Sequence, residues 1–348
     1  MLLVIQAVVS YRSVPRTLNL LNALTGFNLG WVPHFTSVIN WTLRLGLGLL
    51  KQVQPVSEPW LAIIDHSIDI GTKKALVVLR VPVAALSLRG SAIQLADCEC
   101  IGLKICERVN GESIAQDLEG IFCQAGKPKA VIKDGDYTLQ KGGSFTSENQ
   151  GIEIPVIADI GHSMATALKK QFEKTDAYQR FITLTSQGAK RLRQTELAFL
   201  IPPKLRSKGR FQSLSTLGQW ADKIVDVFAV QGRAKKGSVL AKLRTALPGF
   251  LRLKPFIKRF ANTAQAVSQV MEILKNKGLD QSHYEQCHRL SETLPKNSKV
   301  KKHLQQWLQQ HLLIQQQLTD LPLLVSSDII ESLFGTISIL LSAVLRPT

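Results

Sequence analysis

Acidic residues follow three short apolar runs of this sequence. The runs end at Asp65, Asp134 and Asp159. Short apolar runs bounded by turn residues are typical of buried strands. An ionised carboxylate beside a buried strand is costly unless it is paired or binds a metal ion. A single aspartate of this kind is usually part of a turn, whereas three of them indicate that the strand ends share a site.

A fourth acid, Glu331, lies near the C-terminus in the segment SSDIIESLFG. Ser326 or Ser327 is a candidate N-cap, which places Asp328 and Glu331 early in a helix. Carboxylates that converge from strand ends and a helix supply the oxygen ligands that Mg²⁺ and Mn²⁺ prefer. Two such ions about 4 Å apart activate a water or a 3′-hydroxyl group and stabilise the leaving oxygen in phosphodiester chemistry. The acids therefore predict a metal-dependent phosphodiester site.

Four segments, in this order, resemble the insertion-sequence transposases of the DDE class, which have a ribonuclease-H-like catalytic core: IIDHSIDIGTKK, VIKDGDYTLQKG, ADIGHSMATALKK and SSDIIESLFG. The resemblance implies that Asp65, Asp134 and Glu331 are the catalytic residues and the metal ligands. Asp69 and Asp136 are rivals for the first two positions, because each lies only a few residues away. Strand geometry favours Asp65 and Asp134, since each directly follows its apolar run.

Asp159 and His162 resemble an accessory Asp-x-x-His motif of some of these transposases, which implies an orienting or DNA-contacting role and no metal. The resemblance also implies the activity: hydrolysis at the ends of a mobile element and strand transfer into target DNA, without a covalent protein–DNA intermediate. Mg²⁺ or Mn²⁺ is the implied cofactor. The implied partners are double-stranded DNA and a second copy of the chain, in the bacterial cytoplasm at the nucleoid.

The formal charge of +17 predicts a polyanionic partner, and nucleic acid is the commonest one. Basic side chains recur in the helical second half with few acids between them, which favours a surface for DNA phosphates over a merely solvated face. We expect DNA contacts from the following residues: Arg44, Lys190, Arg191, Arg193, Lys204, Arg206, Lys208, Arg210, Lys235 and Lys236.

The expected fold class is α/β: a ribonuclease-H-like mixed sheet with a large all-α insertion and an N-terminal helical region. Apolar runs predict strands at 60–64, 75–81, 129–133 and 152–158, and a third strand within 83–94. Residues 111–125 have helical spacing. The expected parts are a helical region (1–52), the core strands and helix (60–162), the basic all-α insertion (163–322) and a core helix that carries the glutamate (323–348).

The N-terminal part predicts two helices joined by a glycine-containing turn, one from Ser10 or Ser13 to about Leu24 and one from about His34 to Leu50. This pair fits a helix-turn-helix unit whose second helix reads DNA through Thr36, Ser37 and Asn40. A plain hairpin of two helices is an equal alternative. If the unit is a helix-turn-helix, we expect its first part to lie upstream of residue 1.

Five cysteines, an odd number, favour reduced thiols; a zinc site from Cys98, Cys100, Cys106 and a histidine is a weaker alternative. The apolar N-terminus lacks the flanks of a signal peptide and is too short for a bilayer span. Two further functions stay open. A nuclease of the same fold would use the same acids, and an inactive nucleic-acid-binding remnant would explain the uncharged stretch after Glu331.

Overall fold

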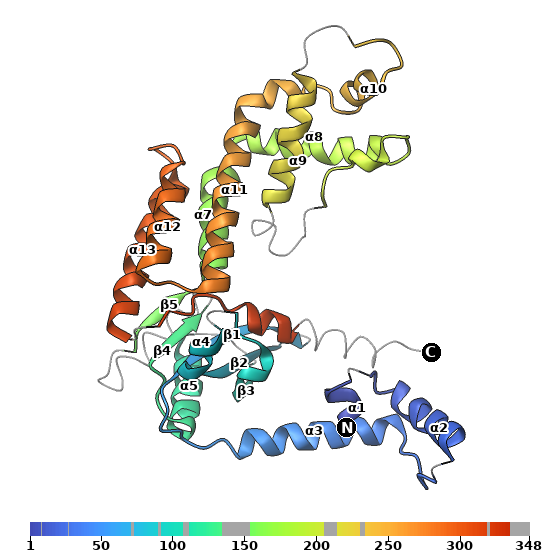
Figure 1. Ribbon diagram of the computed structural model, residues 1–348, viewed down its shortest axis with the longest axis vertical. Coiled ribbons are helices and arrows are strands. Elements are labelled where there is room, and N and C mark those ends of the chain that lie inside the picture. The colour runs from blue at the N-terminus through green and yellow to red at the C-terminus, as the bar shows by residue number, and fades with distance from the viewer. Residues whose placement is uncertain are drawn as a thin grey trace. The chain divides into compact units, whose positions relative to one another are not determined.

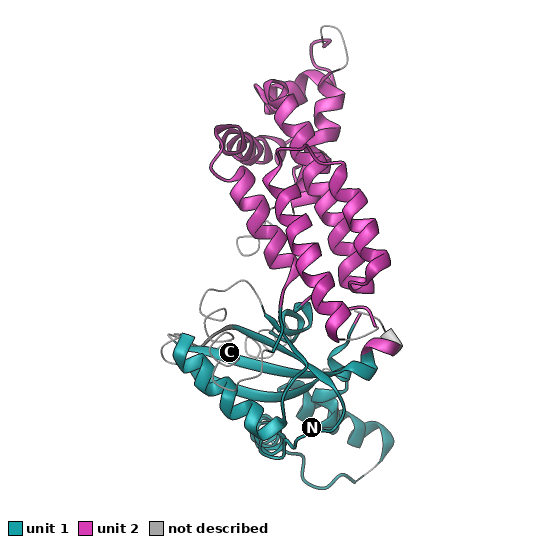
Figure 2. Cartoon of the chain, turned by 90° about the vertical axis from the view of Figure 1, so that its left-hand side faces the viewer, with its two compact units in different colours: residues 1–85, 93–156, 327–348 teal, residues 86–92, 157–326 magenta. Residues whose placement is uncertain are grey.

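The computed structural model describes residues 1–7, 9–26, 28–70, 73–89, 92–106, 111–133, 154–204, 214–229, 234–318 and 321–334, with the backbone alone for residues 67–70, 88 and 89. It divides into two compact units, which Figure 2 colours separately. Unit 1 comprises Met1–Ala85, Ile93–Val156 and Ser327–Thr348, and unit 2 comprises Leu86–Ala92 and Ile157–Ser326. The architecture is mixed α/β.

A five-stranded mixed sheet with the order β3-β2-β1-β4-β5 organises the first unit (Figure 1). The strands are β1 (Trp60–Ile70), β2 (Lys73–Pro82), β3 (Glu99–Cys106), β4 (Ala130–Lys133) and β5 (Val156–Ala158). β1 pairs antiparallel with β2, and β2 pairs antiparallel with β3. β1 pairs parallel with β4 from Leu61↔Ala130 to Ile64↔Lys133. β1 is therefore the central strand.

Helix α5 (Gly111–Ala125) packs on one face of this sheet, as its periodicity predicts. Its residues Ile114, Leu118 and Phe122 are buried together with Trp60 and other apolar residues of β1 and β2. Gly102 of β3 permits this packing, because a Cβ at that position would collide with the side chain of Ile121 on α5.

Two predictions about the strands are wrong. β1 does not end at residue 64 but continues to Ile70, because it pairs with β2 as far as Ile70↔Lys73. The described residues of 83–94 supply no third strand: Val83–Arg89 form α4, and residues 92–94 lead into a short 3₁₀ turn, η1 (Leu95–Asp97). Alanine and leucine in α4 are strong helix formers. The third strand is β3, which contains the β-branched residues Ile101 and Ile105.

The N-terminal region contains α1 (Leu2–Ile5), α2 (Ser13–Thr25) and α3 (Phe35–Lys51), so the two predicted helices are confirmed. α2 ends at Gly26, whose positive φ of 68° suits a glycine cap. The ring of His34 caps α3 by accepting from the backbone N–H of Thr36. Val4, Val14 and Val38 form a small core between the helices.

Unit 2 is helical in its described part, as predicted. Its α-helices are α7 (Ile160–Phe172), α8 (Asp176–Leu192), α9 (Leu214–Phe228), α10 (Val239–Ala246), α11 (Lys254–Lys277), α12 (Gln281–Glu292) and α13 (Lys299–Leu318), with 3₁₀ turns η2 (Ala198–Leu200) and η3 (Phe250–Leu253). The ring of Phe260 contacts Phe172 edge-on and Phe181 at a tilt, with centroids 5.2 Å and 5.4 Å apart. Across the described ranges, no helix is both long enough and apolar enough to cross a bilayer.

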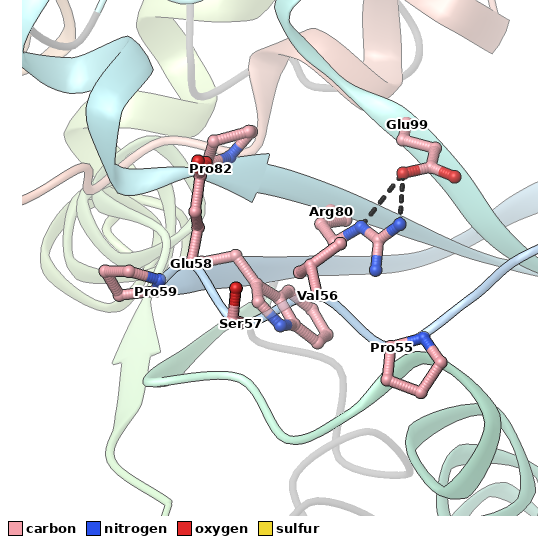
Figure 3. A pocket seen from close by; sticks show the side chains of 9 residues that line it. Pro55, Val56, Ser57, Glu58, Pro59, Arg80, Pro82 and Glu99 are labelled. Atoms are coloured by element: carbon pink, nitrogen blue, oxygen red, sulfur yellow. Dashed lines mark hydrogen bonds and ion pairs between the residues drawn. The ribbon is translucent and has the colours of Figure 1, made fainter.

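Arg80 of β2 is buried and connects four parts of unit 1 (Figure 3). Its Nε and Nη2 donate to Oε2 of Glu99 on β3. Its Nη1 donates to the backbone oxygens of Gln54, at 3.0 Å, and Ala125, at 3.3 Å. The guanidinium carbon also lies 5.8 Å from the ring centroid of Trp60. One side chain thus ties the linker before β1 and the end of α5 to the sheet.

A groove of about 480 Å³ lies beside this side chain (Figure 3). It is lined by the linker and the sheet edge: Pro55, Val56, Ser57, Glu58, Pro59, Trp60, Arg80, Pro82 and Glu99. Because the ion pair and the backbone bonds already engage the guanidinium, we attribute the groove to the packing of the linker.

We predict that Arg80→Met destabilises unit 1 by about 2–4 kcal/mol, because the backbone oxygens of Gln54 and Ala125 lose their donor and Glu99 loses its partner. Chemical denaturation followed by circular dichroism measures this loss. Lys104→Met on the neighbouring strand is the matched control, since Lys104 is exposed, and it should change stability by less than about 0.5 kcal/mol. Equal stability of the two variants would contradict the role given to Arg80.

Candidate functional site

The fold places Asp65 inside the sheet, on the central strand β1, where it is 4% exposed. Its Oδ1 accepts a hydrogen bond from the backbone N–H of His66 at 2.6 Å. The described pairs between β1 and β4 run as far as Ile64↔Lys133, and Asp65 is the next residue of β1. The register between β1 and β2 shifts between Asp65 and Ile68. Such irregularities re-aim side chains and are frequent beside active sites.

The face to which Asp65 belongs follows from strand alternation. Side chains two residues apart share a face of a strand, so Asp65 shares the face of Leu61 and Ile63. Ala62 and Ile64 belong to the opposite face and to the cluster that contains α5. The carboxylate is therefore on the side of the sheet that α5 does not cover.

The partners predicted for Asp65 are only partly within the described residues. Asp134 directly follows Lys133, the last residue of β4, and both it and its rival Asp136 lie outside the described residues. Asp69, the rival of Asp65, pairs with Lys74 near the end of the hairpin. The assignment of Asp134 therefore stays a prediction.

Glu331 lies on a helical stretch, residues 328–334, which belongs to the same unit as Asp65. Ile330 and Phe334 of this stretch are buried, whereas Asp328 and Glu331 are exposed. The early helical position expected for the glutamate is confirmed, and the glutamate occupies the polar side of the helix.

The chemistry of the predicted ligands fits a hard cation. Asp65 and Glu331 offer carboxylate oxygens, which Mg²⁺ and Mn²⁺ prefer. Within the described ranges no three histidine, cysteine or acidic side chains converge on one point. The alternative of a zinc site at Cys98, Cys100 and Cys106 is therefore wrong, since all three thiols are described. Burial, reinforced by Asp97, raises the pKa of the Cys98 thiol to about 11.

Asp159 begins α7 as its N-cap: its Oδ1 accepts from the backbone N–H of His162 at 2.7 Å. The residue is 2% exposed. A Cβ on Gly161 would lie 3.1 Å from this oxygen and 3.3 Å from the Nζ of Lys275. The Asp159 carboxylate and the Lys275 ammonium group therefore both lie next to Gly161. The buried carboxylate thus caps the start of α7, and the orienting or DNA-contacting role expected for Asp159 and His162 stays a prediction.

Two aromatic side chains of α13 hold the end of β5, next to Asp159. Trp307 Nε1 donates to the backbone oxygen of Ala158 at 3.2 Å. His311 Nε2 accepts from the backbone N–H of Ala158 at 3.0 Å, and its Nδ1 lies 2.7 Å from the backbone oxygen of Trp307. A carbonyl oxygen only accepts, so Nδ1 carries the proton and the imidazole is neutral. The two rings stack, with centroids 4.0 Å apart.

The seven described members of the predicted DNA-binding set are all exposed: Arg44, Lys190, Arg191, Arg193, Lys204, Lys235 and Lys236. Arg206, Lys208 and Arg210 lie outside the described residues. Lys258, from another basic cluster, lies 2.9 Å and 2.8 Å from carboxylate oxygens of Asp222 and Asp226, so acids already surround its charge.

The sequence did not predict a role for three residues: Lys275, which lies beside Asp159, His303, and His311, which anchors Ala158. His303 Nε2 lies 2.9 Å from Ser163 Oγ, and its pKa is lowered by burial and by Lys170. The four-residue spacing of Trp307 and His311 in a helix was the available signal, because such pairs share a face.

Protonation of His311 should destabilise unit 2. Burial lowers its pKa from 6.5 to about 4, and a second proton would point Nε2 at the N–H of Ala158. The folded pKa lies below the unfolded one, so the stabilisation is complete above pH 6.5 and is lost as the pH falls toward about 4. The loss should be roughly 3 kcal/mol. His311→Gln should remove this slope in denaturation midpoints, whereas His34→Gln, at an exposed position, should keep it.

No protein-family model matches the sequence, and no curated protein matches it. Among solved structures, the chain is similar to the "Drosophila P element transposase strand transfer complex". The two chains are 12% identical, the match covers 93% of this chain and 83% of the other, and the TM-score is 0.43. A likeness of this strength defines neither a family nor an activity for the chain.

Proposed function

We propose that this chain is a DNA transposase of the DDE class, which cleaves and joins phosphodiester bonds with Mg²⁺ or Mn²⁺. The observation that carries the proposal is the buried carboxylate of Asp65 on the central strand, one residue beyond the last described pair of β1 with β4, Ile64↔Lys133. Asp134 is the residue that follows β4, and it follows Ile132 by two residues, the spacing at which side chains of a strand share a face.

The strand order supports a ribonuclease-H-like core. An antiparallel β1–β2–β3 sheet, a helix and a β4 strand parallel to β1 follow each other along the chain. This is the order that the resemblance implies. The main segment of unit 2, Ile157–Ser326, precedes the helical stretch that carries the glutamate in the sequence, as expected for an insertion at this point of the chain.

In this proposal Asp65, Asp134 and Glu331 hold the metal ions, which supply activation of the attacking hydroxyl and charge stabilisation at the leaving oxygen. The sheet fixes the position of the Asp65 carboxylate, whose Oδ1 accepts a hydrogen bond from the His66 N–H. The exposed arginines and lysines of unit 2 bind phosphates and position the duplex without reading its sequence.

We expect Asp65→Asn, Asp134→Asn and Glu331→Gln each to lower strand cleavage by at least roughly 10³-fold, because each removes a charged metal ligand. The substrate is DNA that flanks the gene, with Mg²⁺ or Mn²⁺ present. DNA affinity should stay within about twofold, since phosphate contacts lie elsewhere. Asp328→Asn, at an exposed position on the same helical stretch as Glu331, is the matched control and should retain activity.

Mn²⁺ binding, followed by electron paramagnetic resonance, gives a readout that does not depend on cleavage. Asp65→Asn should weaken it and Asp328→Asn should not. Cut ends without joined products would identify a nuclease of the same fold. An unmodified chain that neither binds Mn²⁺ nor cuts DNA would refute the proposal and leave a DNA-binding remnant.

The phosphate surface makes a separate prediction about salt. The logarithm of the DNA affinity should fall linearly with the logarithm of salt concentration, and each phosphate contact contributes a slope of about −0.9. Lys190→Ala and Arg193→Ala should each reduce the magnitude of this slope by roughly one. Lys127→Ala removes the same charge from an exposed position of unit 1 and should leave the slope unchanged. Equal slopes for all three variants would exclude a role for α8 in DNA binding.

A further inference from the structure

A groove in unit 2 lies between helix α8 and the segment that leads into η3, and nothing in the proposed chemistry uses it. One of its walls is a stretch of α8 from Gln179 to Gln187, and the other consists of residues between 248 and 253. Its volume is about 520 Å³, which lies within the range of about 300–1,000 Å³ that is typical of ligand sites.

Two contacts fix these walls relative to each other. Phe250 of η3 is fully buried, and the centroid of its ring lies 5.9 Å from that of Phe181 on α8. Leu247 lies against Gly188 of α8, where a Cβ would collide with the leucine side chain. The groove is therefore preformed, and a ligand does not lose affinity by ordering its walls.

The rim of the groove is positively charged. Arg180 and Arg252 come from opposite walls, both are exposed, and no acidic side chain is among the described residues that line the groove. Across the described part of the chain, neither arginine makes a hydrogen bond or an ion pair, whereas Lys301 of the same unit is paired with Glu292. A guanidinium group binds a carboxylate through two parallel hydrogen bonds, so the two arginines favour an acidic ligand.

The groups between the arginines favour a peptide over DNA. Leu184 and Leu253 are half-buried and offer apolar contacts, for which a DNA backbone has no counterpart. Gln179 and Gln187 carry amide groups that both donate and accept, as the N–H and C=O groups of a peptide require. The described lining contains no aromatic side chain on which a nucleobase could stack.

We infer that the groove between α8 and η3 binds an acidic peptide segment of a partner protein. Carboxylates of this segment pair with Arg180 and Arg252, and its apolar side chains contact Leu184 and Leu253. An extended segment in which glutamate and leucine alternate meets both conditions, because successive side chains point to opposite sides. Neither arginine belongs to the set expected to contact DNA, and the inference does not depend on the proposed catalytic activity.

Fluorescence anisotropy of a labelled peptide, Glu-Leu-Glu-Leu-Glu-Leu, tests the inference on the full chain. It should bind at about 150 mM salt, where charges more than about 8 Å apart are largely screened. The peptide with glutamine in place of glutamate should bind at least about 10-fold more weakly. R180Q/R252Q should raise the dissociation constant at least about 10-fold. K223Q/K277Q removes the same charge from exposed positions of α9 and α11 and, as the matched control, should change it less than about twofold.

A second variant fills the groove without a change in charge. Thr183→Trp, at an exposed position of the α8 wall, should also raise the dissociation constant at least about 10-fold, because the indole occupies the space of the peptide. Thr245→Trp, at an exposed position of α10, should not. Circular dichroism checks that each variant keeps the helical fold.

Three results would overturn the inference: equal affinity for the two peptides, equal affinity of R180Q/R252Q and K223Q/K277Q, or unchanged binding by Thr183→Trp. A fourth would assign the groove to DNA instead. In that case R180Q/R252Q would lose affinity for duplex DNA and keep its affinity for the peptide.

Discussion

Unit 1 depends on the contacts that the Arg80 guanidinium makes with its neighbours. A buried positive charge is tolerated only with partners of good geometry, and Arg80 has a carboxylate, two carbonyl oxygens and an aromatic ring. These partners come from β3, from the linker, from the end of α5 and from β1. The position of α5 and the entry of the chain into β1 are thereby fixed, and with them the strand that carries Asp65.

A different kind of interaction organises the start of unit 2. There, both backbone groups of Ala158 bond to side chains of α13, one to the indole of Trp307 and one to the neutral imidazole of His311. Backbone groups at the end of a strand need such partners when they are buried. Side chains far along the chain thus hold the residue that precedes the Asp159 cap.

Much of the architecture could be predicted from the sequence, because periodicity governs it. The spacing of Ile114, Leu118 and Phe122 gave α5 with its observed bounds, and the helical character of the second half was evident. The length of β1 and the position of β3 could not be predicted, because they depend on pairing between strands. The roles of Arg80, Lys275 and His311 were hidden for the same reason: each acts on a group distant in sequence. The sequence indicated Asp159 as a site residue, but it did not indicate that the side chain is buried.

The division of the chain has a consequence for how the protein is made. Residues 327–334 belong to unit 1. The 170 residues that precede them, from Ile157 to Ser326, belong to unit 2. At a synthesis rate of about 5–20 residues per second, roughly 10–30 s separate the two parts of unit 1 on the ribosome. Unit 2, contiguous over that span, can fold during this interval. Unit 1 is therefore complete only after its last described segment, residues 327–334, has left the ribosome.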